Sequence, residues 1–600
     1  MGKRLVSLLT TLALAVSAFA SLTVAPAGAQ VGPEFPDTTI YFPFVPNGEV
    51  LAGTGPWFGA IAIQNVEGTD IVVEVYRAGA SAPVSRAQVN ANGSRVWTSG
   101  DIFGSASSGT FFPVRGTPAD TADVISLGSC QPTSISVRQG STVYSSPSDY
   151  TYTISGSTLT INWAPAGAEP AGGTTYSVTA TGPGCGGQGG GVFVRGCVDS
   201  SGVTGVCDSD DEDARIAGVV KTAAPRPLTS DGRTTAQHEM VSGYTALPAE
   251  ALEDDQLWGL PIVQSGWSGW NSVIYITNFS DEDNCAVDVT LYKSPFGLGD
   301  PAPGIFSETL DAGDTWVLDL TGWQDNWAGS AFIDADCAIA VSSDRIKAEQ
   351  PWGDPVNMAL SNVGQPFNEA EEEVYAPLIF DRYNGWNTGI SIVNLDDDDD
   401  ANVTITFYNL AGAPAGSATL RLRPRAVEWI YRPNLTNLGL MSVAQARIVA
   451  DEPIAVAVDQ VKYVGADADT GHAMSYNAQT GGYDLALPLF QNAGTSNDIS
   501  GIAIYNPNDY NASVEVYVYS RTGFEWATFE YTISANGAAI IYAPTDLPEL
   551  PGGFVGNVYI SSNVEVVAVS NNVAYADVPA ANRGPRFDGS AAFNMAVLYD

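Results

Sequence analysis

Short runs of alternating apolar and polar residues recur along the chain, and they predict β-strands throughout. Four runs of β-branched and aromatic residues end in a tyrosine and are bounded by Gly, Asn or Asp: 71–76, 287–292, 403–408 and 514–519. A second pattern, rich in Ala, Ile and Val, recurs at 216–220, 331–341, 446–458 and 557–569. Because no segment shows a sustained helical period, the pattern predicts an all-β fold with few helices.

The same set of residues recurs four times along the chain, which predicts a tandem array. Each round begins with a proline, passes through an Ile-x-Asn and a tyrosine-ending strand, and closes with a methionine. The markers are Pro43, Pro261, Pro377 and Pro488, then Asn65, Asn278, Asn394 and Asn506, then Met240, Met358, Met474 and Met595. We expect four β-sandwich repeats, at 30–248, 249–365, 366–480 and 481–600. The methionines are expected to be equivalent core residues, and the asparagine amides to hold the following turns.

The distance from the repeated asparagine to the methionine locates an insertion. It is 80 residues in the second and third rounds and 89 in the fourth, but 175 in the first. The excess predicts an inserted domain at about 117–212 with its own core at 130–185. Runs at 150–154, 159–163 and 176–180 alternate cleanly, so each strand there is expected to bury one face.

The repeats resemble a known class of β-sandwich. Gly-Trp-Asn-Thr-Gly-Ile-Ser-Ile-Val-Asn at 385–394, the strand ending at Tyr408 and Ile-Ala-Val-Ala-Val at 454–458 resemble immunoglobulin-like repeats of bacterial exported envelope proteins, such as surface-layer or filament proteins. The insert, with Ser-Pro-Ser-Asp-Tyr-Thr at 146–151 and Trp-Ala-Pro at 163–165, resembles small immunoglobulin-like modules of surface and filament proteins. The resemblance covers nearly all of residues 38–600. It implies a fold and export, and it carries over no catalytic residue.

The N-terminal residues have the character of a secretory signal. Lys3 and Arg4 precede an apolar run at 5–22, and Ala-Gly-Ala at 27–29 offers a cleavage site, so we expect a signal peptide at 1–29 and a secreted protein. A membrane anchor is the alternative, but polar residues dilute the run. No later segment approaches the roughly 20 apolar residues of a membrane helix.

Charge and cysteine content narrow the class further. A net charge of −41 excludes nucleic acid as an expected partner, because a phosphate backbone requires a basic face. Six cysteines in an exported chain predict disulfides. Their positions suggest the pairs Cys130–Cys185, Cys197–Cys207 and Cys285–Cys337. A metal site is the alternative, and it lacks Cys-x-x-Cys spacing and nearby histidines.

Motifs for enzymatic chemistry are missing from the sequence. The two histidines, His238 and His472, each stand two residues before a repeat methionine, which favours packing over catalysis or copper binding. We find no nucleophile elbow, phosphate-binding loop or zincin helix. Pairs of carboxylates are always available among 66 acidic residues, so they do not identify a hydrolase. The sequence therefore predicts a protein that is not an enzyme.

Two groups of residues are candidates for binding. Acidic residues follow two of the repeated asparagines and are expected to be solvated turns, with calcium as the alternative ligand: Asp281, Glu282, Asp283, Asp396, Asp397, Asp398, Asp399 and Asp400. Tryptophans precede three Ile-x-Asn strands, where they are expected to plug the domain ends, with stacking on sugar rings as the alternative: Trp57, Trp267, Trp270 and Trp386.

Repeats without a chemistry, together with disulfides and export, predict a structural or adhesive protein of the cell exterior. A surface-layer, sheath or filament subunit is expected, with self-association or other envelope proteins as partners. No cofactor is expected, and calcium in the acidic loops is the alternative. An extended arm at 30–37 is the expected assembly contact, with a disordered leader as the alternative. The alternatives are an extracellular carbohydrate-binding array that uses the tryptophan loops and, less favoured, a secreted hydrolase.

Overall fold

The computed structural model describes residues 38–598 with internal gaps, and within it the chain is all-β, as predicted. The gaps are 104–107, 112, 114, 116–121, 128–131, 140–141, 156–157, 165–166, 171–175, 182–188, 199–206, 208–210, 226–238, 255, 348–357, 436–442, 463–471, 494–497 and 575–588. The short helical segments are α2 (Ser99–Phe103), α3 (Ala543–Asp546), η1 (Ala249–Ala251), η2 (Gly297–Gly299), η3 (Phe367–Glu369) and η4 (Arg432–Asn434). None of the described helices has the length and apolar character needed to span a bilayer.

The first repeat is a sandwich of two antiparallel sheets. One has the order β18-β1-β14-β4-β5 with β15 beside β14, and the other has the order β17-β16-β3-β2 with β6 beside β3. The strands are β1 (Thr39–Val45), β2 (Asn47–Leu51), β3 (Thr54–Asn65), β4 (Ile71–Arg77), β5 (Ser85–Val89), β6 (Ser94–Thr98), β14 (Gly190–Val198), β15 (Glu212–Asp213), β16 (Ile216–Pro225), β17 (Glu239–Thr245) and β18 (Leu247–Pro248).

The second repeat has the same two layers, in the orders β22-β21-β24-β19-β27 and β23-β20-β25-β26. Its strands are β19 (Leu257–Ser265), β20 (Trp270–Asn278), β21 (Cys285–Lys293), β22 (Gly304–Leu310), β23 (Thr315–Asp319), β24 (Trp327–Ala335), β25 (Ile339–Lys347), β26 (Met358–Val363) and β27 (Gln365–Pro366). Their alternating inward residues fill the core between the layers.

In the third and fourth repeats one long strand, β33 or β40, pairs in both layers. The third repeat has β28 (Glu371–Tyr383), β29 (Trp386–Asn394), β30 (Ala401–Asn409), β31 (Pro414–Leu422), β32 (Val427–Tyr431), β33 (Val443–Lys462) and β34 (His472–Asn477). The fourth has β35 (Gly482–Asn492), β36 (Ile499–Tyr505), β37 (Ala512–Ser520), β38 (Glu525–Ile533), β39 (Ala538–Tyr542), β40 (Phe554–Ala574), β41 (Gly589–Asn594) and β42 (Ala596–Leu598).

Each repeat closes on its own first strand. Strands β18, β27 and β42 pair with β1, β19 and β35, and in the third repeat Gln479 bridges to Tyr375 of β28. The closing residues therefore lie at 247–248, 365–366, 479 and 596–598, at the ends of the four sequence rounds. This pairing makes each round one structural unit.

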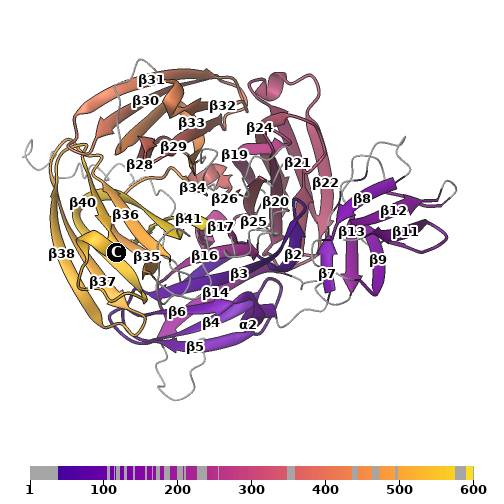
Figure 1. Ribbon diagram of the computed structural model, residues 1–600, viewed down its shortest axis with the longest axis horizontal. Helices are drawn as coiled ribbons and strands as arrows, with labels where there is room; N and C mark the ends of the chain where they lie inside the picture. Colours follow the sequence, from indigo (N-terminus) through magenta and orange to yellow (C-terminus); the bar gives the residue numbers. More distant parts are fainter. Residues whose placement is uncertain are drawn as a thin grey trace, which may run out of the picture. The chain divides into compact units, whose positions relative to one another are not determined.

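The insert forms a module with two sheets of its own (Figure 1). Its strands, in the orders β10-β9-β13-β7 and β11-β12-β8, are β7 (Ser108–Phe111), β8 (Ala122–Ser126), β9 (Ser134–Gln139), β10 (Thr142–Tyr144), β11 (Tyr150–Ser155), β12 (Thr158–Trp163) and β13 (Ser177–Thr181). These limits differ from the expected 117–212. Strand β7 already pairs with β13, whereas β14 returns to the first repeat between β1 and β4.

The repeated asparagines hold the following turns, as predicted. Each is fully buried, and its side-chain amide donates to a main-chain carbonyl four or five residues on, at 2.7–2.9 Å. Its side-chain oxygen accepts an N–H from the residue two positions on. One side chain thus satisfies both sides of a tight turn that the backbone alone leaves open.

The methionines are all buried, but the prediction that they are equivalent is wrong. In each repeat, the residue that pairs with the repeated asparagine gives a common starting point for counting along the ladder. Counted from that residue, Met240, Met358 and His472 occupy the same position. Met474 lies two residues further along β34. Met595 matches Ala478. The N–H of Met595 donates to the carbonyl of Ala568 and that of Ala478 to the carbonyl of Val456, and these two carbonyls hold the same ladder position. Similar spacing in the sequence concealed different loop lengths before this last strand. His472 is a buried packing residue beside Trp386, and His238 lies outside the described residues.

Two of the three predicted disulfides are confirmed. The Cα atoms of Cys197–Cys207 and of Cys285–Cys337 are each 5.7 Å apart. The first bridge closes the loop that follows β14, and the second ties β21 to the turn between β24 and β25. The third pair, Cys130–Cys185, and the expected signal peptide at 1–29 lie outside the described residues.

Neighbouring repeats meet through a turn that contains a glycine with positive φ. The four glycines follow strands β4, β21, β30 and β37, and they are Gly79, Gly297, Gly412 and Gly523. A Cβ atom on any of them would collide with a backbone carbonyl of the next repeat: that of Ala312, Pro424, Ala535 or Ala91. Only glycine permits this approach. Because Gly523 of the fourth repeat meets Ala91 of the first, the series of interfaces closes on itself.

The strands β17, β26, β34 and β41, which hold equivalent places near the end of each repeat, also meet. Strand β17 contacts β26 and β41, and β34 contacts the same two strands. Side chains at equivalent positions link them: Thr245 Oγ1 donates to the carbonyl of Asn594 at 2.7 Å, and Asn594 Nδ2 donates to that of Asn477 at 2.9 Å. Asn477 Nδ2 in turn donates to the carbonyl of Val363 at 2.9 Å. Every repeat therefore contacts at least two others.

Candidate binding site

A cleft of about 190 Å³ lies where the second repeat meets the third. Aromatic side chains from both repeats line it: Trp267 and Trp270 from the second, and Trp429 and Tyr431 from the third. Its polar lining residues are Gln264, Ser268, Arg345, Ser391 and Asp459. Strands from both repeats are required, so neither repeat alone would form the cleft.

A tight turn between β19 and β20 presents Trp267. Three of its residues have positive φ: Gly266 at 66°, Ser268 at 50° and Gly269 at 84°. The turn closes through the N–H of Trp270, which donates to the carbonyl of Trp267 at 2.9 Å. Trp267 then packs edge-to-face on Trp429 across the interface, with ring centroids 5.6 Å apart. Both rings stay half-buried, so part of each ring faces solvent.

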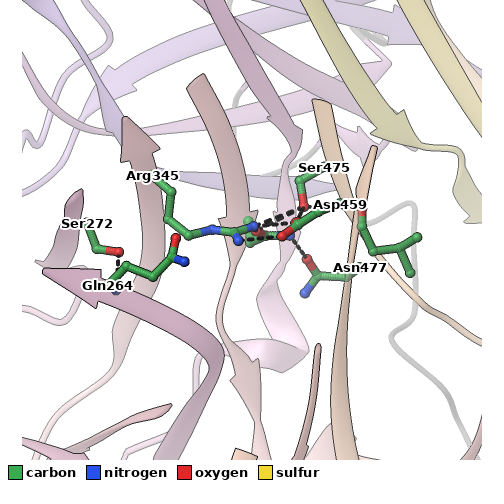
Figure 2. Close-up of polar contacts among 8 residues, drawn as sticks. Gln264, Ser272, Arg345, Asp459, Ser475 and Asn477 are labelled. Carbon is green, nitrogen blue, oxygen red and sulfur yellow. Dashed lines mark hydrogen bonds and ion pairs between the residues drawn. The ribbon is translucent and has the colours of Figure 1, made fainter. Parts of the chain in front are cut away.

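Arg345 of β25 forms the polar floor of the cleft. Its side chain is 2% exposed, and its guanidinium forms a two-pronged ion pair with Asp459 of β33 (Figure 2). It also donates to Asn362 Oδ1 at 2.7 Å and to Ser475 Oγ at 3.4 Å. A planar guanidinium held in this way keeps a fixed orientation.

The network continues away from the cleft along β26 and β34. Asn362 Nδ2 donates to Ser475 Oγ at 2.8 Å and to Asn477 Oδ1 at 3.0 Å. Ser475 Oγ donates to Asp459 Oδ1 at 2.8 Å. Figure 2 shows Arg345 of the second repeat facing Asp459, Ser475 and Asn477 of the third. Removing one member would leave a buried charge or amide without its partner, so the network holds the cleft floor rigid.

The same ladder positions hold different residues in the other repeats. The position of Arg345 is occupied by Thr222, Gln460 and Asn572. The position of Asn362 is occupied by Tyr244, Tyr476 and Phe593. Tyr244 and Tyr476 each donate an O–H to a main-chain carbonyl of the first strand, at 2.7 Å. In the second repeat Asn362 takes this position and belongs to a buried charged network.

Sequence reasoning found only part of this site. Trp57, Trp270 and Trp386 are 0%, 5% and 3% exposed, so they plug the ends of their repeats and offer little ring surface. Arg345, Asn362 and Asp459 were missed. Comparing the repeats position by position would have singled out Arg345, but that alignment required the strand register.

Several carboxylates of the acidic loops make contacts within or beside their own turns, and calcium binding there stays a prediction. Asp396 accepts the N–H groups of Asp398 and Asp399, which lower its pKa, and thereby closes its own turn. Asp397 pairs with Arg425 at 3.3 Å, and Asp400 pairs with Arg421 at 2.8 Å. Asp281, Glu282 and Asp283 lie in an exposed turn. In the described part of the chain, the one convergence of three potential metal ligands is Cys285, Asp336 and Cys337, and its two cysteines form a disulfide.

Buried carboxylates occur at a different interface, between the first and second repeats. Glu49 accepts the N–H of Asn47 at 2.5 Å and that of Gly189, and burial raises its pKa to about 7. Asp344 accepts from Tyr275 at 2.9 Å and from Ser361, and burial raises its pKa to about 6. Phe44, Trp57 and Tyr275 pack around them with at most 3% exposure. These acids are held within a core and are not presented to a substrate.

The cleft has the means to bind a small polar ring. The Trp267 and Trp429 rings offer apolar faces, and Gln264 and Ser391 offer hydrogen-bonding groups above the floor that Arg345 and Asp459 form. Flat apolar faces beside fixed hydrogen-bonding groups suit a molecule with hydroxyl groups at its edge and C–H groups on its face.

Comparisons with known proteins identify only a small part of the chain. A model of a domain of unknown function, DUF4815, matches residues 112–181, which overlap the inserted module. No curated protein matches the chain significantly. Because the family match covers so little of the chain, it does not assign the whole protein to a family.

Solved structures give weak likenesses. The Thermotoga maritima protein 1070 is 15% identical to this chain, and the match has a TM-score of 0.15. The match covers 18% of this chain and 93% of that protein. The sensory rhodopsin transducer of Anabaena is 21% identical with a TM-score of 0.13, covering 15% and 94%. A glycosyl hydrolase family 2 member of Bacteroides cellulosilyticus is 6% identical with a TM-score of 0.10, covering 43% and 28%. Likenesses at these scores do not bear on function.

Proposed function

We propose that this chain is an exported, non-enzymatic adhesive protein that binds a sugar residue of an extracellular glycan in the tryptophan-lined cleft. The proposal joins the adhesive role expected from the sequence to the carbohydrate-binding alternative. Of the predicted tryptophans it keeps Trp267 and adds Trp429, since both rings are half-buried and lie against each other at the repeat junction.

One observation carries the proposal. At the position where the other repeats have Thr222, Gln460 or Asn572, the second repeat holds a fully buried arginine with a charged partner in another repeat. Burying such a pair costs desolvation energy that apolar packing would avoid, so it is weak support for stability. A local departure of this kind, placed directly beneath aromatic residues in a cleft, is typical of a functional site.

The test is a glycan-binding measurement on the mature protein. Trp267→Ala and Trp429→Ala should each weaken binding to the glycan found on an array by about tenfold, which corresponds to 1.4 kcal/mol. Trp526→Ala is the matched control, because Trp526 is 41% exposed on β38 and lies outside the cleft. Asp459→Asn should also weaken binding, by releasing the guanidinium of Arg345.

Equal binding by the two cleft variants and the wild type would overturn the proposal. So would an equal loss with Trp526→Ala, since that would indicate non-specific stacking.

The expected surface-layer, sheath or filament assembly stays a prediction. The closing strands β18, β27 and β42 pair with the first strands of their own repeats. The arm at 30–37 lies outside the described residues. Electron microscopy of the native material would show an ordered lattice or fibre if assembly occurs.

A further inference from the structure

The inserted module ends in an uncharged strand at the edge of one of its sheets. Strand β11 pairs with β12 on one side, and no other described strand pairs with its opposite side (Figure 1). Its sequence is Tyr-Thr-Tyr-Thr-Ile-Ser, with no charge and no proline. The free side of such a strand presents N–H and C=O groups that can pair with a further strand. We call this side the β11 edge.

The outer edge strands of the four repeats differ from β11, because each of them carries charge. These strands are β5, β22, β31 and β38. Their charged residues include Arg86, Glu308, Arg421 and Glu530. Charged side chains on an edge strand discourage pairing with another chain. Strand β11 lacks this protection, so its edge suits the addition of a strand better than the other four do.

Two apolar side chains of β11 face the core side of their sheet but remain uncovered. Tyr152 pairs with Ile161 of β12, and Ile154 pairs with Leu159. Residues directly opposite each other in an antiparallel pair lie on the same face of the sheet. Ile161 and Leu159 are fully buried, whereas Tyr152 is 37% and Ile154 is 40% exposed. The core of the module therefore stops short of its edge strand, and a further strand would cover both residues.

The side chains of β11 are complementary to themselves. From Thr151 to Ser155 the order is hydroxyl, apolar, hydroxyl, apolar, hydroxyl, which is the same in both directions. When two copies pair antiparallel about a twofold axis at Thr153, Tyr152 of each copy lies opposite Ile154 of the other. Pairs of aromatic and β-branched residues, and pairs of threonines, stabilise antiparallel strands. This symmetry favours a second copy of the chain over an unrelated partner.

The low charge of the module removes an obstacle to this pairing. The whole chain carries a net charge of −41, so two copies repel each other through their acidic surfaces. Residues 108–181 contain only four acidic residues and two arginines, and none of them lies in β11. Contact between two copies at the β11 edge is therefore opposed by little charge.

We propose that the β11 edge is a homodimer contact, in which the β11 strands of two copies of this chain pair antiparallel about Thr153. The two three-stranded sheets join into one six-stranded sheet, and Tyr152 and Ile154 of each copy cover those of the other. The contact is isologous, so it closes after two copies and builds no fibre by itself. One strand pair buries less area than a standard interface, so the dimer is weak and depends on concentration. It does not depend on the glycan proposal.

Disulfide cross-linking tests both the contact and its register. Opposite residues of antiparallel strands have Cα atoms about 4.5–5.5 Å apart, which a disulfide can span. The mature Thr153→Cys variant should therefore form a covalent dimer under mild oxidation, seen by non-reducing electrophoresis. Thr151→Cys is the matched control. In this register the two copies of residue 151 are four positions, or roughly 14 Å, apart along the strands, so they should not cross-link.

Sedimentation velocity over a range of concentrations tests the dimer without a cross-link. The mature wild type should show a monomer–dimer equilibrium. Thr153→Lys places two ammonium groups opposite each other and should raise the dissociation constant by about tenfold. Ser136→Lys is the matched control, because it adds the same charge at an exposed position of β9, an inner strand of the module's other sheet. It should leave the dissociation constant unchanged.

The proposal is overturned if the wild type stays monomeric up to about 1 mM. Equal cross-linking of Thr153→Cys and Thr151→Cys would also overturn it, because the register would then be wrong. A dimer that Thr153→Lys and Ser136→Lys weaken equally would use another surface, with the same consequence. Near-ultraviolet circular dichroism of each variant checks that the fold is retained.

Discussion

At the scale of single residues, the interface between the first two repeats places ionisable groups in an apolar environment. Glu49 is 3% exposed and Asp344 is 4% exposed, beside the stacked rings of Phe44 and Tyr275. Burial disfavours the charged form of a carboxylic acid, which is why the pKa of Glu49 rises to about 7 and that of Asp344 to about 6. Near neutral pH this interface holds carboxyl groups that are partly protonated.

Glu49 should make stability depend on pH. Between its ordinary pKa of 4.5 and its folded pKa of about 7, the folded chain binds a proton that the unfolded chain has released. The free energy of unfolding contributed by this group is therefore fully present below pH 4.5 and falls as the pH rises through about 7. Glu49→Gln should flatten this slope, and denaturant unfolding measured between pH 4.5 and 8 would show it.

Glu530→Gln, at an exposed position of β38, is the control and should leave the slope unchanged. A Glu49→Gln variant with the wild-type slope over the same pH range would show that the group does not titrate in the folded chain.

At the scale of elements, the glycine turns join one repeat to the next. Gly523 has a φ of 77° and lies against the carbonyl of Ala91, so a side chain there is disfavoured by backbone conformation and by contact. Gly553 has a φ of 93° with no neighbour that a Cβ would meet. The two positions separate conformational strain from interface packing.

Gly553→Ala should lower the free energy of unfolding by about 1–2 kcal/mol through the left-handed backbone alone. Gly523→Ala should lose a further ~1–3 kcal/mol, because the added methyl group separates the fourth repeat from the first. Urea unfolding monitored by tryptophan fluorescence would measure both variants. Equal losses would show that the turn does not hold the interface together.

At the scale of the whole molecule, the apolar cores extend across the repeat boundaries. The core of the fourth repeat includes Ala62, Val219 and Val241 of the first. Lys221 of the first repeat also pairs with Asp498 of the fourth at 2.8 Å. An open tandem array leaves its two end faces uncovered, and such arrays unfold repeat by repeat. In this chain the two end repeats cover each other.

The four repeats should therefore unfold together. Calorimetry of the mature protein should show one transition for the repeats, with a van't Hoff enthalpy close to the calorimetric one. The inserted module has its own core, which includes Leu159, Ile161 and Trp163, and is free to give a separate transition. Three or more resolved transitions would contradict this prediction.

The sequence predicted the elements well, because their signals are local. Alternation at 159–163 became the buried Leu159, Ile161 and Trp163 of β12, and the repeated asparagines became turn holders. The same expectation is wrong for 150–154, because β11 buries only Tyr150 and leaves Tyr152 and Ile154 exposed. Cysteine positions were enough to predict the pairs Cys197–Cys207 and Cys285–Cys337. The predicted equivalence of the four methionines was wrong, because spacing along the chain does not reveal loop length or ladder register.

The sequence by itself determined an all-β chain of four repeats with one insertion, because strand period, turn residues and repeat spacing act within a few residues or recur along the chain. The tertiary structure alone decided that the fourth repeat meets the first and that a cleft lies where the second repeat meets the third. Arg345 and Asp459 stand 114 positions apart in the chain, and neither signals its partner. Their pairing arises from how whole sandwiches pack, which depends on matching surfaces that no local pattern records.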